Sequence, residues 1–305
     1  MAVRHEKLLP LALLIMINIF WGSSYTFTKI ALQELSPGAL VLLRYGVASI
    51  FFLGMILPSK EGDSISLRTI PRLIVLGFFG FAASPLLNNI GVHYSRAMDA
   101  SIIIVLEVVF TTALGALWLK EPWHTRKTFA LLLGIAGVFL LSGFSWEGRL
   151  SDSSHLIGNL LIMLSLVFEV VYTILGKKTV EDRSPLAVTG YSVLIGAILL
   201  APFFGSQLAP SSLVTLSFKT WMAVLYLSLI CTVVCYSIWF LMLSRMEAGN
   251  VAISLYVQPL TGTLLAVLAL GEKIIFSTLI GAGAILLSVM IAVAKEPVKS
   301  SLSEL

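Results

Sequence analysis

Two carboxylates interrupt apolar stretches of the sequence that are otherwise long enough to cross a bilayer. Glu107 lies in the run SIIIVLEVVFTTALGALWL, and Glu169 lies in a second apolar run, residues 156–176. An ionised acid that faces lipid costs several kcal/mol, so both side chains are expected to face protein or water. Carboxylates in such places form ion pairs or carry protons, and either chemistry is a candidate here.

Two basic side chains, Lys29 and Arg44, also fall inside predicted membrane spans, at a depth comparable to that of Glu107. An ion pair between Glu107 and either cation would offset both buried charges. Such a pair could be a fixed clamp between helices, and Lys29 could instead extend to the outer interface. Glu169 has no basic residue in its own polar stripe, so it is the better candidate for a group that carries protons.

Polar and aromatic residues recur at three- and four-residue spacing in several apolar stretches, which places them on one face of each helix. Such faces must meet protein or water, and together they predict a cavity with aromatic walls and few charges. An interhelical hydrogen bond, or an aromatic position near the membrane interface, is the alternative for each residue alone. The residues expected to line the cavity are Asn18, Trp21, Tyr25, Ser84, Asn88, Tyr172, Thr173, Tyr236, Trp239, Ser254 and Gln258.

The composition places these stretches in an all-α polytopic membrane protein. The chain has 305 residues, of which 58% are hydrophobic and 12% are charged, about half the charged fraction of a soluble domain. Cutting the sequence at charges, prolines and polar clusters predicts ten transmembrane helices, most of them close to the length that spans a bilayer. Their expected ranges are 8–32, 38–57, 73–94, 100–119, 129–144, 156–176, 186–204, 220–243, 251–270 and 274–294.

The distribution of Lys and Arg predicts the orientation of these helices. Fourteen of the twenty basic residues fall on the side of the N-terminus, four on the opposite side and two within spans. Because basic residues collect in cytoplasmic loops, both termini are expected to be cytoplasmic. The same rule accounts for the net charge of +4, so no nucleic-acid partner is expected.

The sequence contains an internal repeat. SYTFTKIALQELSP resembles VYTILGKKTVEDRSP, and LEVVFTTALGALWLKE resembles VQPLTGTLLAVLALGE. Glu107 precedes Glu121 by fourteen residues, and Gln258 precedes Glu272 by the same interval. Glu121 and Glu272 end predicted helices near the two surfaces, where they could help to gate or, as we favour, cap a neighbouring helix.

The repeat unit contains five predicted helices, and its expected bounds are residues 1–146 and residues 147–305. Since five is odd, the second unit crosses the membrane in the opposite sense to the first. Inverted repeats of this kind are typical of transporters that bind substrate near the membrane midplane, between the two halves.

Four stretches resemble the EamA branch of the drug/metabolite transporter superfamily: FWGSSYTFTKIAL, LLRYGVAS, LEVVFTTALGALWLKE and SLYVQPLTGTLLAVLALGE. The resemblance covers nearly the whole chain and implies ten helices in two inverted five-helix repeats around a central cavity. It also implies transport of small molecules, often export of amino acids or related metabolites. Two features depart from the family: its usual Glu-Pro pair is divided between Glu107-Val108 and Gln258-Pro259, and Glu169 stands where a small residue is usual.

These features favour a secondary transporter that moves a small metabolite, or a drug, across a bacterial inner membrane by alternating access. Export is favoured and import is left open. An integral-membrane enzyme is less favoured, because the sequence lacks H-E-x-x-H, G-x-S-x-G and metal-binding acidic clusters. No catalytic residue, metal or cofactor is therefore expected. A channel is less favoured because neither a ring of charge nor a filter segment is visible.

The expected partners follow from the same reading. They are a small-molecule substrate, membrane lipids and, in a coupled mechanism, protons. The oligomeric state is left open.

Overall fold

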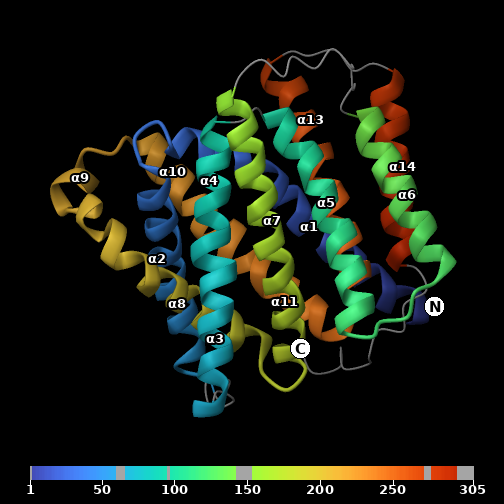
Figure 1. Cartoon of the computed structure of the whole chain (residues 1–305), viewed down its shortest axis with the longest axis horizontal. Helices are drawn as coiled ribbons and strands as arrows, with labels where there is room; N and C mark the ends of the chain where they lie inside the picture. The colour runs from blue at the N-terminus through green and yellow to red at the C-terminus, as the bar shows by residue number, and fades with distance from the viewer. Residues whose placement is uncertain (1, 60–65, 95–96, 142–152, 271–275, 294–305) are drawn as a thin grey trace.

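The apolar runs of the sequence form helices, because a segment in a bilayer must satisfy its backbone hydrogen bonds internally. The computed structural model describes residues 2–59, 66–94, 97–141, 153–270 and 276–293. These residues form helices joined by turns and loops, and they include no strand (Figure 1).

The elements of the first half follow one another as a series of helices with a π-helical insertion. They are α1 (Ala2–Ala31), α2 (Pro37–Ile56), η2 (Leu67–Thr69), α3 (Ile70–Leu76), η3 (Gly77–Ala83), α4 (Ser84–Tyr94), α5 (Ala97–Trp118) and α6 (Thr125–Leu141).

The second half repeats this order with additional short helices. Its elements are α7 (Ser153–Val180), α8 (Pro185–Phe204), η4 (Gly205–Leu208), α9 (Pro210–Val214), α10 (Phe218–Leu225), η5 (Tyr226–Val234), α11 (Cys235–Arg245), α12 (Ala248–Ile253), η6 (Ser254–Tyr256), α13 (Val257–Leu270) and α14 (Phe276–Val293).

Six helical stretches in the described part of the chain are long and apolar enough to cross a membrane, with mean hydropathies from 1.4 to 2.2. The chain is therefore a membrane protein. These stretches are Leu9–Ala31, Pro37–Ile56, Leu67–Tyr94, Ile157–Val180, Pro185–Leu208 and Phe218–Arg245. Two shorter apolar helices, Leu106–Trp118 and Leu279–Ala292, lie within other predicted spans. The count of ten spans and the cytoplasmic placement of both termini stay predictions.

The Ser-Pro pairs of the sequence repeat begin α2 and α8 in the same way. The hydroxyl of Ser36 accepts the backbone N–H of Ala39 at 3.2 Å, and that of Ser184 accepts the N–H of Ala187 at 3.3 Å. In both pairs the proline occupies the first helical position, where its missing N–H leaves no hydrogen bond unmade. The repeated sequence thus folds into the same helix cap in both halves.

The core is shared between the halves, since the first helix of each half packs against the other half. α1 packs against η5, α11 and α13, whereas α7 packs against η3, α4 and α5. Equivalent helices also pair directly, because α2 packs on α8 and α6 packs on α14, the latter pair lying at one side of the bundle (Figure 1). This exchange brings residues from both halves to the same central region.

Two π-helical segments, η3 and η5, interrupt the third long helix of each half. π-helical turns are rare and occur often at functional sites. Within η5 the hydroxyl of Thr232 donates to the carbonyl oxygen of Leu227, five residues earlier, at 2.8 Å. The apolar periodicity of the sequence did not predict either segment. Both end next to the central cavity, η3 directly before Ser84 and η5 two residues before Tyr236.

Candidate functional site

A central cavity of about 130 Å³ lies between the two halves, about ten times the space that one water requires by the same measure. Residues of α1, α2, α4, α5, α7, α11, η6 and α13 form its wall. The predicted residues that the structure brings together there are Trp21, Tyr25, Arg44, Ser84, Asn88, Glu107, Glu169, Tyr236, Trp239 and Gln258.

Most other residues of the wall lie outside the set predicted from the sequence, whereas Ser165 belongs to the polar stripe of Glu169 on α7. Two of them, Ser24 and Thr28, extend the three-and-four spacing of Trp21 and Tyr25 on α1, so a longer stripe would have included them. Tyr45 follows Arg44 and had no comparable pattern. The additional wall residues are Ser24, Thr28, Tyr45, Pro85, Asn89, Ser165, Leu166 and Leu255.

Asn18 and Ser254 do not line the cavity but join α1 to the second half beside it. The side-chain amide of Asn18 donates to the hydroxyl of Ser254 at 2.8 Å, and Gln258 donates its Nε2 hydrogen to Asn18 Oδ1 at 3.1 Å. All three side chains are buried. The sequence left open whether each polar residue lines the cavity or forms a hydrogen bond between helices. Asn18 and Ser254 form the hydrogen bond.

Tyr172 and Thr173 also lie off the cavity wall, in the packed core. The ring of Tyr172 stands edge-on to those of Phe81 and Phe240, with centroids 5.1 and 5.2 Å apart. The Tyr172 ring packs directly on η3 at Gly80, where an added Cβ atom would lie 2.4 Å from the ring. The hydroxyls of Tyr172 and Thr173 are buried without a hydrogen-bond partner in the described structure.

The expected pairing of Glu107 with Lys29 or Arg44 is not formed. Lys29 has an exposed side chain. Arg44 directs its Nε hydrogen to the hydroxyl of Thr232 at 2.8 Å, and its guanidinium carbon lies 5.2 Å from the centroid of the Tyr45 ring. The ion pairs found in the described residues lie elsewhere, at Glu121 and Glu247.

Glu169 has the polar surroundings that were expected for Glu107. Its carboxylate accepts the hydroxyl of Ser84 at 3.1 Å and that of Tyr236 at 3.4 Å. Arg44, on α2, lies on the same cavity wall, although no ion pair joins it to Glu169 within the described residues. The sequence did not predict these neighbours, because the spacing of residues along α7 identifies only residues on the same helix.

Glu107 is 7% exposed and lines the cavity from α5. Within the described residues, neither a hydrogen bond nor an ion pair reaches its carboxylate. Glu169 and Tyr25 line the same cavity. Two acids therefore share one cavity, and among the described residues Glu169 has polar partners whereas Glu107 has none.

Aromatic rings form a fixed part of the wall. Trp21 stands edge-on to Tyr236 and Trp239, with ring centroids 5.1 and 5.4 Å apart. Its indole N–H donates to the carbonyl oxygen of Cys231, in η5, at 2.8 Å. The indole is thus held at both its ring and its N–H, and the faces of these rings suit an apolar or cationic group.

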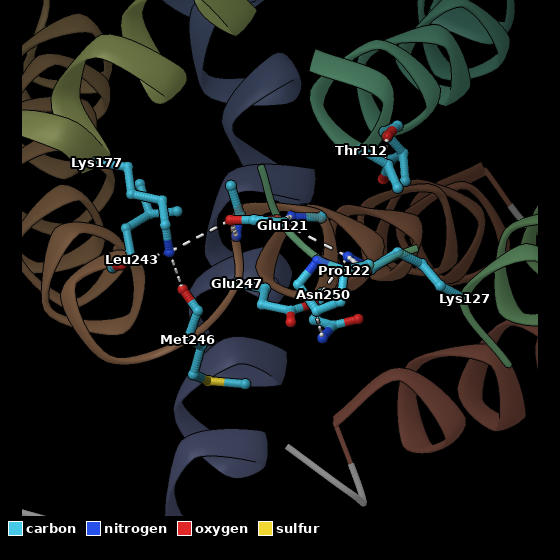
Figure 2. Close-up of polar contacts among 12 residues, drawn as sticks. Thr112, Glu121, Pro122, Lys127, Lys177, Leu243, Met246, Glu247 and Asn250 are labelled. Atoms are coloured by element: carbon cyan, nitrogen blue, oxygen red, sulfur yellow. Dashed lines mark hydrogen bonds and ion pairs between the residues drawn. The ribbon is translucent and has the colours of Figure 1, made fainter. Parts of the chain in front are cut away.

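A second cluster of charge lies at the N-terminus of α12 (Figure 2). The carboxylate of Glu121 accepts the backbone N–H of Ala248 at 2.6 Å and that of Gly249 at 3.2 Å. Free N–H groups and a partial positive charge at a helix start favour a carboxylate there. The cap predicted for Glu121 is thus confirmed, although the sequence did not identify α12 as its partner. Glu272 lies outside the described residues.

Two lysines complete this cluster and join several elements (Figure 2). Lys177, on α7, lies 3.4 Å from Glu121 and donates to the carbonyl oxygens of Leu243 and Met246. Lys127, on α6, lies 2.8 Å from Glu247 and 3.8 Å from Glu121. Lys127 is 3% exposed and Glu121 is 9% exposed. The cluster therefore ties α6 and α7 to the α11–α12 turn.

The model of the EamA-like transporter family matches residues 8–143 and again residues 156–294. A crystal structure of another protein superposes with a TM-score of 0.73 at 18% identity, over 94% of this chain and 96% of that one. That likeness concerns the fold alone.

Individual relatives are similar over nearly their whole length. An "Uncharacterized transporter" of Archaeoglobus fulgidus is 30% identical over 93% of this chain and 97% of its own. A "Probable amino-acid metabolite efflux pump" of Escherichia coli is 27% identical over 88% of this chain and 90% of its own. The family resemblance predicted from the sequence is confirmed.

Proposed function

Because the chain belongs to the EamA-like transporter family, we propose that it carries a small metabolite through the central cavity by alternating access. The observation that carries this proposal is the cavity itself, whose polar and aromatic wall is built from helices of both halves. A site shared in this way opens to either side of the membrane when one half rocks against the other.

Export of an amino acid or related metabolite is the favoured direction and substrate class. It is supported by the relatives in Escherichia coli and Salmonella typhimurium that are named amino-acid metabolite efflux pumps. Import through the same cavity is the second candidate. Drugs are included among the substrates to be tested, and the proposed location is a bacterial inner membrane.

Proton coupling is proposed at Glu169 rather than at Glu107. Ser84 and Tyr236 donate to the Glu169 carboxylate, and Arg44 lies on the same cavity wall. A proton that arrives on this carboxylate changes both hydrogen bonds, which come from two other helices. Such a group can couple proton exchange to a movement of the halves.

Cysteine labelling tests the cavity directly. Cys231 and Cys235, both buried and free, are replaced first, and single cysteines are then placed at Trp21, Asn88, Tyr236 or Gln258. A water-soluble thiol reagent should modify these positions, whereas a cysteine at Ala48, which is fully buried away from the cavity, should stay unmodified. Uniform inertness of the four positions would remove the basis for the proposal.

The substrate is sought by thermal stabilisation of the purified protein with a panel of metabolites and drugs. Ligands that bind the folded state raise its melting temperature, by an amount that grows with the ratio of ligand concentration to dissociation constant. A compound that stabilises the protein should also protect the four cysteines from modification. Transport of that compound into and out of liposomes then determines the direction.

A further inference from the structure

The two halves differ at one pair of equivalent contacts. The sequence repeat aligns Tyr25 with Tyr172, and the same alignment makes Gly22 on α1 equivalent to Glu169 on α7. It also aligns Gln258 on α13 with Glu107 on α5. Since α1 packs on α13 and α7 packs on α5, the pair Gly22–Gln258 corresponds to the pair Glu169–Glu107.

The contact between α1 and α13 is closed and neutral. A Cβ atom at Gly22 would lie 2.5 Å from the backbone oxygen of Gln258, so the two helices touch there. The side chain of Gln258 donates to Asn18 at 3.1 Å. At this contact the protein therefore supplies a polar partner for the residue that corresponds to Glu107.

The corresponding contact between α7 and α5 lacks that partner. Ser165 stands where the repeat has Asn18, and its hydroxyl donates to the carbonyl oxygen of Ile162 at 2.7 Å and accepts from Asn88 at 3.4 Å. Glu107 is 7% exposed, faces the cavity, and has no hydrogen bond or ion pair within the described residues. The carboxylate is thus buried and directed at a space that the protein does not fill.

The described residues of the cavity wall include one basic and two acidic side chains, Arg44, Glu107 and Glu169. Arg44 and Glu169 have hydrogen-bond partners in the protein, Thr232 for the first and Ser84 and Tyr236 for the second. Glu107 has neither a hydrogen bond nor an ion pair within the described residues. A buried carboxylate is stabilised by a cation that donates hydrogen bonds to it.

We propose that the cavity binds a small organic monocation, a protonated amine, whose ammonium group pairs with Glu107. The inference deepens the proposed transport function and rests on it. An ammonium group supplies both the positive charge and the N–H donors that Glu107 lacks. The apolar part of the ligand lies against the aromatic wall formed by Trp21, Tyr25 and Trp239, whose ring faces also attract cations.

A zwitterionic amino acid fits the same wall less well. It carries no net charge, so it leaves the described part of the wall, with the acids Glu107 and Glu169 and the cation Arg44, one positive charge short. The structure therefore favours the amine over the amino acid that has the same side chain. Butylamine and norvaline form one such pair, and 2-phenylethylamine and phenylalanine form another.

The test measures binding to the purified full-length protein by thermal shift and calorimetry. Butylamine and 2-phenylethylamine are compared with alcohols of the same carbon skeletons and with norvaline and phenylalanine. The amines should bind at least ten-fold more tightly than both sets of analogues. Equal or tighter binding of the alcohols or the amino acids, or no binding of either amine to the folded protein, overturns the assignment.

Variants assign the amine to its carboxylate. Glu107→Gln should lower amine affinity at least ten-fold, Glu107→Asp should retain part of it, and Glu34→Gln, an exposed site away from the cavity, should change nothing. Amine affinity that survives Glu107→Gln overturns the assignment. If Glu107→Gln does not fold, Glu107→Asp provides the test. Its shorter side chain lengthens the distance to the ammonium group, so it must lower the affinity for amines more than the affinity for alcohols.

Failure of this inference and failure of the transport function give different results. If neutral or zwitterionic metabolites protect the cavity cysteines and the amines do not, the transport function stands and the ammonium site falls. If the cavity cysteines are inert toward the thiol reagent, the transport function itself falls.

Discussion

The hydroxyl of Ser84, on α4, donates a hydrogen bond to the carboxylate of Glu169, on α7, at 3.1 Å, although the two residues lie in different halves of the chain. Glu169 also accepts a hydrogen bond from Tyr236, in the second half, at 3.4 Å, and Arg44, in the first half, lies on the same cavity wall. This carboxylate is therefore a junction between the halves, and any movement of one half against the other must change its surroundings.

The first prediction concerns this junction. Arg44→Gln should lower the stability of the folded protein by about 1–3 kcal/mol, because it removes the hydrogen bond to Thr232 and the positive charge on the wall that Glu169 shares. The double variant Arg44→Gln/Glu169→Gln should recover part of that loss. Melting temperatures of the two single variants and the double variant measure the coupling.

The control is a second double-mutant cycle, in which Glu107→Gln replaces Glu169→Gln as the partner of Arg44→Gln. Because the pairing of Arg44 with Glu107 is not formed in the structure, this second cycle should give little or no recovery. Strictly additive effects in the first cycle, with recovery in the second, would instead support the pairing expected from the sequence.

The second prediction concerns protons. Glu169→Gln keeps the size of the side chain and one of the two oxygens that accept hydrogen bonds, but it cannot exchange a proton in the physiological range. Transport by this variant in liposomes should depend less on pH than transport by the unchanged protein, while the melting temperature shows that the variant is folded. A pH profile that matches that of the unchanged protein would exclude Glu169 as the coupling group.

The sequence predicted the features that follow from local chemistry. Ser-Pro pairs mark helix starts, Glu121 at a helix end suggests a cap, and three-and-four spacing places most of the wall residues on inward faces. It did not predict which helices meet. Tyr172 lies on a polar stripe but is covered by η3, and Asn18 lies on another but bonds to Ser254.

Ser84 and Glu169 show the same limit. Their hydrogen bond joins residues 85 positions apart in the chain, and the spacing of residues along one helix carries no information about such a pair. The π-helical segments are similarly invisible, because an added residue in one turn leaves the apolar composition unchanged.

The third prediction concerns the charge cluster shown in Figure 2. Glu121→Gln removes the charge that faces Lys177 and Lys127 and weakens the cap of α12. Removal of one member of a buried ionic cluster should cost about 3–5 kcal/mol. The measurement is the melting temperature of the purified protein, with the exposed Glu181→Gln as the control. Equal melting temperatures for the two variants would show that the cluster contributes little to stability.

The fourth prediction uses two glycines that lie inside helices. Gly22→Ala places a methyl group 2.5 Å from the backbone oxygen of Gln258, so α1 must move away from α13. Overpacking of this kind costs about 1–3 kcal/mol. Gly46→Ala, on α2, meets no atom within 4 Å and should be neutral or slightly stabilising, because alanine favours a helix. Similar melting temperatures for both variants would contradict the close contact.

The last prediction concerns orientation. Two loops that the inverted repeat assigns to the same side of the membrane are in contact in the structure: Ser217 donates its N–H to Glu34 at 2.8 Å. The inverted repeat assigns Lys127, Lys177, Glu121 and Glu247 to the opposite side, and these residues also contact one another.

The distribution of basic residues predicts that the second group lies in the cytoplasm. In a background without Cys231 and Cys235, a cysteine at the exposed position Lys219 should react with a membrane-impermeant thiol reagent in intact cells. Cysteines at Lys178 and Lys120, which are also exposed, should react only after the cells are permeabilised. The reverse pattern would invert the orientation, and labelling of all three positions from the same side would exclude the inverted repeat.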